Sequence, residues 1–95
     1  MPYIAVCKDK GGSAELRQSE LAAHLEYIDT IRGQLLVAGP LSSAAGSRYD
    51  GSVFIYDVDS IDAAQKLLEN DPYYLADIYA SVEFAEFTPA RGNWL

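Results

Sequence analysis

The chain has 95 residues, 49% of them hydrophobic, and this size predicts one small domain, 1–95. Fourteen acidic residues against 7 basic ones give a net charge of −7, which argues against binding to nucleic acid or to anionic membranes. No apolar run reaches the ~20 residues of a membrane span, and the first residues lack a signal-peptide pattern. With one cysteine and one histidine, an internal disulfide is excluded and a Cys/His metal cluster is disfavoured. We therefore expect a cytoplasmic protein without a metal or cofactor.

The first half of the chain predicts a strand, a long helix and a second strand. Residues 3–9 (YIAVCKD) are β-rich, are apolar on both faces and end at a Lys-Gly-Gly break. Ser13 is placed to cap a helix that runs to about Arg32, with Gly33 just past its end. The next strand is 34–38 (QLLVA), closed by Gly39 and Pro40. The inner stripe of the helix is predicted to hold the apolar residues Leu16, Leu21, Leu25, Ile28 and Ile31.

The second half predicts a loop, a strand, a helix, a short helical turn and a last strand. The loop is 41–51, and the strand after it is 52–58. The helix is capped by Asp59 or Ser60, and its inward-facing residues are Ile61, Ala64, Leu67 and Leu68. It stops at 70–72, where a short helical turn can start, and the last strand is 79–87. Residues 90–95 form a tail whose one large apolar residue is Trp94.

This β-α-β-β-α-β order is the ferredoxin-like pattern, an α+β fold with an antiparallel sheet and two helices on one face. Strands 3–9 and 52–58 are apolar on both faces, so the uncovered face of the sheet would be a large exposed apolar patch. A second copy packed sheet against sheet is the simplest cover, which predicts a homodimer. The alternative is that Trp94 and the tail fold back over this face.

One face of the predicted first helix carries the strongest candidates for functional residues. His24 shares this face with Leu21 and Ile28, and Arg17 lies seven residues earlier on the same stripe. A titratable group and a cation are therefore predicted to face the body of the protein. The same pattern also fits a histidine at the core edge and an arginine whose charged end reaches water.

Asp71 is the second candidate, because a carboxylate can orient an imidazole. A His–Asp pair fixes the histidine tautomer and suits general acid–base chemistry near neutral pH. Aspartate before Pro72 is also an ordinary helix cap, and one carboxylate can serve both purposes.

Two further segments could contact a ligand. Gly39 and Pro40 allow a close backbone approach, and Ser42 offers a hydroxyl just after them, although an ordinary turn explains these residues equally well. Tyr73, which follows Asp71, could line a pocket for a ring-shaped ligand, or it could pack in the core or a dimer interface. The chain has no phosphate-binding GxxxxGK[ST] loop and no GxSxG nucleophile motif.

The combination of these motifs resembles the YCII-related family of small bacterial proteins over residues 3–89. The motifs are, in order, Arg17 with His24, Ala38-Gly39-Pro40, Ala63-Ala64-Gln65, Asn70-Asp71-Pro72-Tyr73 and Phe87-Thr88-Pro89. The resemblance implies a homodimer of the dimeric α+β barrel group, with a pocket near the first helix and the sheet. It also implies that His24 and Asp71 are the catalytic pair, with Arg17, Gly39 and Pro40 beside them.

The function hypothesis that follows is a cofactor-free lyase or isomerase, similar to a dehydrochlorinase, with a small phenolic or enolisable substrate. His24 would remove a proton, Asp71 would hold the ring, and Arg17 would offset negative charge on the substrate. Ser42 and Tyr73 would complete the binding site. One enzyme that the chain resembles removes chloride from a chlorinated hydroxyhydroquinone. The alternatives are a non-catalytic ligand-binding or accessory module that uses the same pocket, and a structural protein with no pocket at His24.

Overall fold

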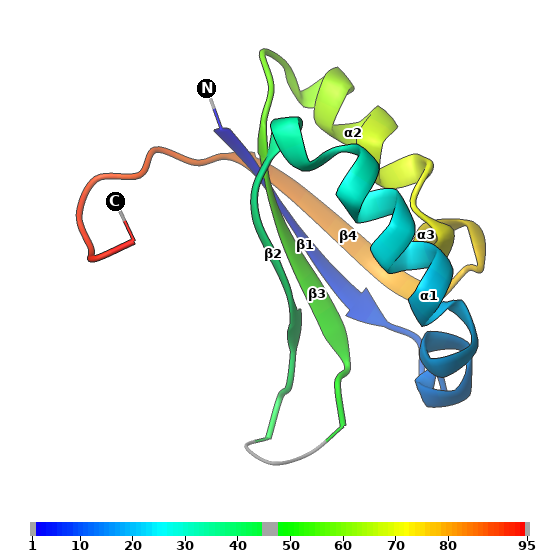
Figure 1. The fold of residues 1–95 in the computed structure, drawn as a ribbon. Helices are drawn as coiled ribbons and strands as arrows, with labels where there is room; N and C mark the ends of the chain where they lie inside the picture. The colour runs from blue at the N-terminus through cyan, green and yellow to red at the C-terminus, as the bar shows by residue number, and fades with distance from the viewer. Residues whose placement is uncertain (1, 45–47, 95) are drawn as a thin grey trace.

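The computed structural model describes residues 2–44 and 48–94, and it shows an antiparallel sheet with helices packed on one face (Figure 1). In chain order the elements are β1 (Pro2–Asp9), α1 (Ala14–Thr30), the 3₁₀ turn η1 (Arg32–Gln34), β2 (Leu35–Leu41), β3 (Gly51–Asp57), α2 (Ile61–Glu69), α3 (Pro72–Leu75) and β4 (Tyr79–Glu86). The strand order β2-β3-β1-β4 is the ferredoxin-like order that the sequence predicts. Within the described residues, no helix is long and apolar enough to cross a membrane.

The alternation of residues along the central strands divides the sheet into two faces. On the side of the helices, Ala5 of β1 lies opposite Phe54 of β3 and Phe84 of β4. Cys7 lies opposite Ser52 on the same side. Ala5, Cys7, Phe54 and Ser52 are all buried, so the core lies between the sheet and the helices.

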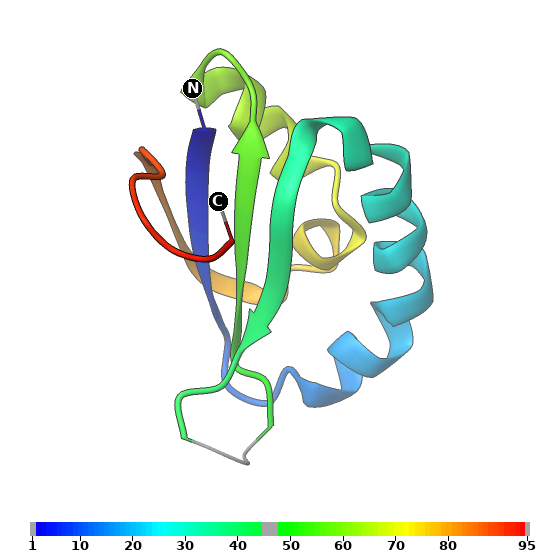
Figure 2. The ribbon, with the colours of Figure 1, turned by 60° about the vertical axis from the view of Figure 1, so that its left-hand side comes forward.

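The opposite face of the sheet is also apolar, as predicted. Ile4 lies opposite Ile55, and Val6 lies opposite Val53, at the alternate positions of β1 and β3. The C-terminal tail lies on this side of the sheet, away from the helices (Figures 1 and 2). Trp94 is 86% exposed, so its ring does not cover the face within one chain.

The inner face of α1 differs from the predicted leucine stripe. Arg17 and Ile31 are buried and Ile28 is half-buried, whereas the leucines at 16, 21 and 25 are 42–52% exposed. The helix ends at Thr30, and Gly33 lies in η1 rather than at the helix end. Ile31, the residue that caps the end of α1, is buried in the core.

The predicted helix starts need two smaller corrections. Ser13 precedes α1 but does not cap it with its side chain, because its Oγ donates to the carbonyl of Lys10 at 2.7 Å. For α2, the cap is Ser60, whose Oγ accepts a hydrogen bond from the N–H of Ala63 at 3.1 Å. Ile61 is 40% exposed rather than inward-facing.

Strand β2 runs further than predicted and includes Gly39 and Pro40 instead of ending before them. Pro40 lies opposite Ser52 of β3. Proline is tolerated here because β2 is an edge strand, where the missing N–H costs no bond to a second neighbour.

The buried thiol of Cys7 makes stability depend on pH. Burial raises its pKa from 9.0 to about 12, with the nearby carboxylates of Asp71 and Asp9 adding to the effect and Arg17 opposing it. Below about pH 9 the thiol is protonated in both the folded and the unfolded chain. Above it, only the unfolded chain loses the proton, so the free energy of unfolding should fall by up to about 1.4 kcal/mol per pH unit. Urea unfolding between pH 8 and about 10 should show a steeper fall in the wild type than in Cys7→Ala. Equal slopes would contradict this.

Candidate active site

A pocket of about 170 Å³ lies between α1 and the β2–β3 side of the sheet. Its lining is mostly apolar, with a few polar groups, and comprises Arg17, Leu21, His24, Leu25, Ile28, Ala38, Gly39, Pro40, Ser52, Phe54 and Tyr73. The structure thus brings together five of the predicted site residues, which come from α1, β2 and α3. The half-exposed leucines 21 and 25 form one wall of the pocket, which accounts for their position outside the core.

His24 and Asp71 are in contact, although 47 positions separate them. The Nδ1 of His24 lies 2.8 Å from Oδ1 of Asp71. The Asp71 side chain is 1% exposed and that of His24 is 12% exposed, so the pair is almost completely shielded from water. Asp71 precedes α3, and its Oδ1 also accepts a hydrogen bond from the N–H of Tyr73 at 2.9 Å. The same carboxylate therefore caps the helix and holds the imidazole.

The His24 ring is also fixed by aromatic neighbours. Tyr73 stacks on it, with ring centroids 3.9 Å apart and planes within 2° of parallel. Phe54 meets it edge-on, with centroids 6.2 Å apart. Together with the hydrogen bond to Asp71, these contacts hold the ring in one orientation.

The hydrogen bond to Asp71 predicts which tautomer His24 adopts. A carboxylate only accepts hydrogen bonds, so Nδ1 must carry the proton and Nε2 keeps its lone pair. Among the described residues, Nε2 has no hydrogen-bond partner. We expect ¹⁵N NMR of the neutral imidazole to show the Nδ1–H tautomer in the folded protein. The same histidine in the urea-unfolded chain is the control, and an Nε2–H tautomer in the folded state would contradict the geometry.

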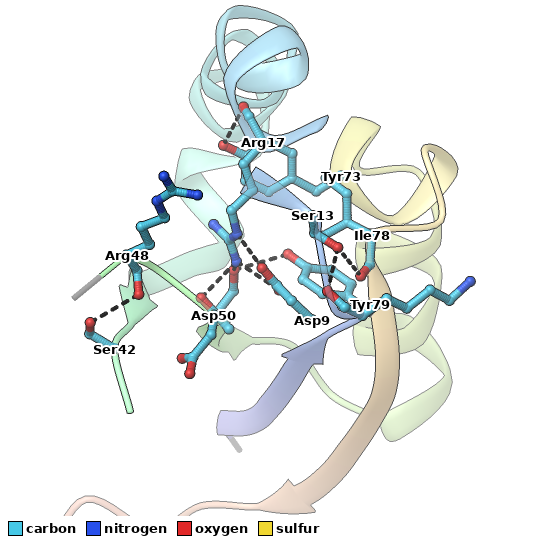
Figure 3. Close-up of polar contacts among 12 residues, drawn as sticks. Asp9, Ser13, Arg17, Ser42, Arg48, Asp50, Tyr73, Ile78 and Tyr79 are labelled. Atoms are coloured by element: carbon cyan, nitrogen blue, oxygen red, sulfur yellow. Dashed lines mark hydrogen bonds and ion pairs between the residues drawn. The ribbon is translucent and has the colours of Figure 1, made fainter. Parts of the chain in front are cut away.

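Arg17 is buried in a polar network beside the pocket rather than extended toward water (Figure 3). Its Nε and Nη2 bind both carboxylate oxygens of Asp9, at 2.5 and 3.0 Å. Nη2 also donates to the carbonyl of Gly51 at 2.7 Å and to Oγ of Ser52 at 2.8 Å. The pKa of Arg17 is raised, because the ion pair with Asp9 outweighs the opposing effect of burial.

A glycine at position 51 allows this network to form. A Cβ there would lie 2.5 Å from the backbone oxygen of Cys7, so a side chain would force β1 and β3 apart. The close approach keeps the Gly51 carbonyl and the Ser52 side chain within reach of Arg17.

Ser42 was expected in the site and lies outside the pocket. It is exposed, and its Oγ donates to the carbonyl of Arg48 at 3.1 Å (Figure 3). The carbonyl of Ala44 lies 3.2 Å from the same hydroxyl. Ser42 directly follows Leu41, the last residue of β2. Ser52, which the sequence reading missed, occupies the pocket wall instead.

Tyr73 is buried in the core and also lines the pocket, with its ring on His24 and its hydroxyl donating to the backbone oxygen of Arg17 at 3.3 Å. Burial raises the pKa of this tyrosine, so its hydroxyl stays protonated near neutral pH. In the part of the chain that the structure describes, no group of three or more His, Cys, Asp or Glu side chains is arranged to hold a metal ion.

The family model for the YCII-related domain matches residues 1–88. The chain belongs to the YCII-related family. Protein YciI of Escherichia coli O6:H1 is 35% identical over 96 residues, covering 92% of this chain and 96% of that protein. Protein YciI of Shigella flexneri matches with the same identity and coverage.

Solved structures confirm the fold class of this YCII-related chain as that of the dimeric α+β barrel proteins. The structure of 5-chloro-2-hydroxyhydroquinone dehydrochlorinase (TftG) from Burkholderia phenoliruptrix AC1100, in complex with 2,5-dihydroxybenzoquinone, has a TM-score of 0.85 and 29% identity, covering 95% of this chain and 96% of that one. The cofactor-independent oxygenase SnoaB from Streptomyces nogalater has a TM-score of 0.53 and 15% identity, covering 96% of this chain and 93% of that one, and shows the fold alone.

Proposed function

We propose that the pocket is the active site of a cofactor-free lyase or isomerase in which His24 and Asp71 transfer protons. The observation that carries this proposal is the 2.8 Å contact between His24, which lines the pocket, and the buried Asp71. The likeness to TftG, which covers almost the whole chain, supports it. The pocket volume is below the ~300–1,000 Å³ typical of drug-sized ligands, which favours a substrate of about one ring.

The proposed reaction begins when Nε2 of His24 takes a proton from a carbon or oxygen of the substrate. The positive charge on the resulting imidazolium is stabilised by Asp71, and the negative charge spreads onto a substrate oxygen as an enolate or phenolate. In an isomerase, the proton returns to a different atom. In a lyase, a neighbouring group leaves with its bonding electron pair, as chloride would from a chlorinated hydroxyhydroquinone, so that HCl is lost in total.

The test is turnover of a panel of phenols and enolisable acids that includes 5-chloro-2-hydroxyhydroquinone. Chloride release and solvent-proton exchange would be followed in the wild type, in His24→Asn and in Glu26→Gln, an exposed control on the same helix. We expect turnover that His24→Asn abolishes and Glu26→Gln retains. Turnover that His24→Asn leaves unchanged would refute the proposal. Binding without any turnover would instead assign the pocket to a ligand-binding or accessory module.

We further infer that two copies associate through the open faces of their sheets. Ile4, Val6, Val53 and Ile55 form an apolar surface there. At its margin, an apolar hollow of about 410 Å³ is lined by Leu36, Val37, Ile55, Phe87, Pro89 and the exposed Trp94. A second copy would bury this surface, as a symmetric sheet-to-sheet dimer does.

The prediction for this surface is that the wild type sediments as a dimer and Ile55→Asp as a monomer. Ile61→Asp is the matched control, because Ile61 is an isoleucine on α2 that is already 40% exposed. A monomeric wild type would contradict the inference.

We also infer that residues 1–95 act as one domain, with 90–95 as its tail, and that the protein works in the cytoplasm. The buried, unpaired thiol of Cys7 supports a reducing compartment.

A further inference from the structure

Ser52 is a buried polar residue in the pocket wall. It has no role in the proton transfer proposed above. It is 4% exposed and lies on the core side of β3, two residues before Phe54. Its Oγ accepts a hydrogen bond from Nη2 of Arg17 at 2.8 Å and another from the hydroxyl of Tyr79 at 3.0 Å.

The hydroxyl proton of Ser52 is not used in a hydrogen bond within the described residues. A serine hydroxyl has two lone pairs and one proton. Arginine can only donate, and Tyr79 donates as well, so both lone pairs are occupied. Burial raises the pKa of Tyr79 well above its usual value, so the phenol keeps a proton that it can donate. No acceptor for the Ser52 proton is found among the described residues, whereas the residue lines the pocket.

We propose that Ser52 is the oxyanion donor of this pocket, and that its hydroxyl binds the phenolate or enolate oxygen of the substrate while His24 handles the proton. This role for Ser52 rests on the proposed function, which places the reaction in this pocket. It adds the group that would bind the negative charge as it develops on the substrate. It also narrows the substrate to a ring that carries both an acidic proton and an oxygen able to hold negative charge.

The surroundings of Ser52 suit this role. A hydroxyl that accepts a hydrogen bond from a guanidinium is a stronger donor through its own proton, because the bonds of a chain polarise one another. Asp9 holds the charge of Arg17 in a buried ion pair, with side chains 4% and 9% exposed. The pocket therefore presents a polarised hydroxyl beside a cation whose charge Asp9 already balances.

The placement of Ser52 relative to His24 is consistent with one ligand touching both. Residues two apart on one strand face are separated by roughly 7 Å, and Phe54, two residues after Ser52, meets the His24 ring edge-on. Both Ser52 and His24 line the same pocket of about 170 Å³, so a ring that fills it lies against both residues.

The experiment measures the affinity of 2,5-dihydroxybenzoquinone, an acidic ring compound, by its absorbance change on binding. We expect Ser52→Ala to weaken binding by about 10- to 100-fold, the range for a lost hydrogen bond to a charged group. Ser52→Thr, which keeps the hydroxyl, should restore most of the affinity. Ser42→Ala is the matched control, since it removes a serine hydroxyl outside the pocket, and it should bind like the wild type. Urea unfolding of each variant confirms that it is folded.

Tyr79→Phe checks the direction of the hydrogen bonds. If Tyr79 donates to Ser52, its removal leaves binding unchanged or slightly weaker. Tighter binding in Tyr79→Phe would show that the Ser52 proton is given to Tyr79 in the wild type, and would overturn the proposal. A wild type that does not bind the probe, or a Ser52→Ala that binds it equally well, would also overturn it.

The two proposals fail in different ways. If the probe binds through Ser52 but no substrate turns over, the acid–base function is wrong and the oxyanion site stands. If turnover depends on His24 while Ser52→Ala has no effect on binding or on kcat/KM, the oxyanion site is wrong and the acid–base function stands.

Discussion

Replacing Asp71 with asparagine is expected to lower kcat/KM by about 10²- to 10⁴-fold, the range of a general acid–base contribution, while the protein stays folded. The carboxylate is buried and accepts hydrogen bonds from Nδ1 of His24 and from the N–H of Tyr73. Asparagine keeps one acceptor oxygen, so it can still cap α3. It carries no negative charge, so it cannot stabilise the imidazolium of the proposed reaction. The effect should therefore fall on kcat more than on KM.

Asp59→Asn is the matched control for this prediction, because Asp59 is exposed and lies just before α2, outside the pocket. Steady-state kinetics on a substrate found by the panel would compare the three proteins, and urea unfolding would compare their stability. Activity in Asp71→Asn within threefold of the wild type would mean that Asp71 is only a helix cap. Equal losses in Asp59→Asn and Asp71→Asn would mean that net charge, not the dyad, controls the rate.

The burial of the second carboxylate oxygen of Asp71 explains why the loss of kcat/KM should be large. Its Oδ2 is buried and has no hydrogen-bond partner among the described residues, and the hydroxyl of Tyr56 is in the same state. A carboxylate with so few partners is poorly solvated, which strengthens its interaction with a charge that forms on His24.

Local sequence patterns were sufficient to predict the strands and the core. The sequence predicted that the strands 3–9 and 52–58 are apolar on both faces, and the structure places Ala5 and Phe54 on the helix side and Ile4 and Ile55 on the opposite side. Strand patterning is informative here because a shift by one residue would move every apolar side chain to the wrong face. The ends of β2 were harder to predict, because proline normally breaks a sheet and only the edge position of the strand permits Pro40.

The helix stripe and the pocket wall could not be predicted from periodicity. Leu21 and Leu25 have helical spacing for a core, yet they line a pocket that the buried Arg17 and the sheet create. Apolar residues at a concave site and apolar residues in a core follow the same spacing, so spacing alone does not separate them.

The pairing of His24 with Asp71 came from the family resemblance, since nothing local links residues 47 positions apart. Ser52 did leave a signal that was missed. It alternates with Phe54 and Tyr56, so it is a polar residue at a core-facing position of an apolar strand, and such residues need a partner or a function.

Removing the positive charge of Arg17 is expected to destabilise the fold strongly. Arg17→Met leaves the carboxylate of Asp9, whose side chain is 4% exposed, buried without its partner. Breaking a buried ion pair in this way costs about 3–5 kcal/mol, a large share of the stability of a domain of this size. Asp9→Asn should also destabilise the protein, but less, because the amide can still accept from the guanidinium. Urea unfolding of each variant measures the loss.

The exposed pair Arg32–Asp29 on the same helix is the matched control. Its side chains are 81% and 65% exposed, so Arg32→Met should change stability by less than about 1 kcal/mol. If the cost of Arg17→Met comes from the stranded carboxylate, then Arg17→Met combined with Asp9→Leu should be more stable than Arg17→Met alone, because no unpaired charge remains. If the double variant lost as much unfolding free energy as Arg17→Met and Asp9→Leu lose together, the network would act through the bonds of Arg17 to Gly51 and Ser52 instead. In that case the main role of Arg17 would be to hold the pocket wall in place rather than to neutralise the charge of Asp9. The Ser52 hydroxyl would then lose its orientation in Arg17→Met and in the double variant alike.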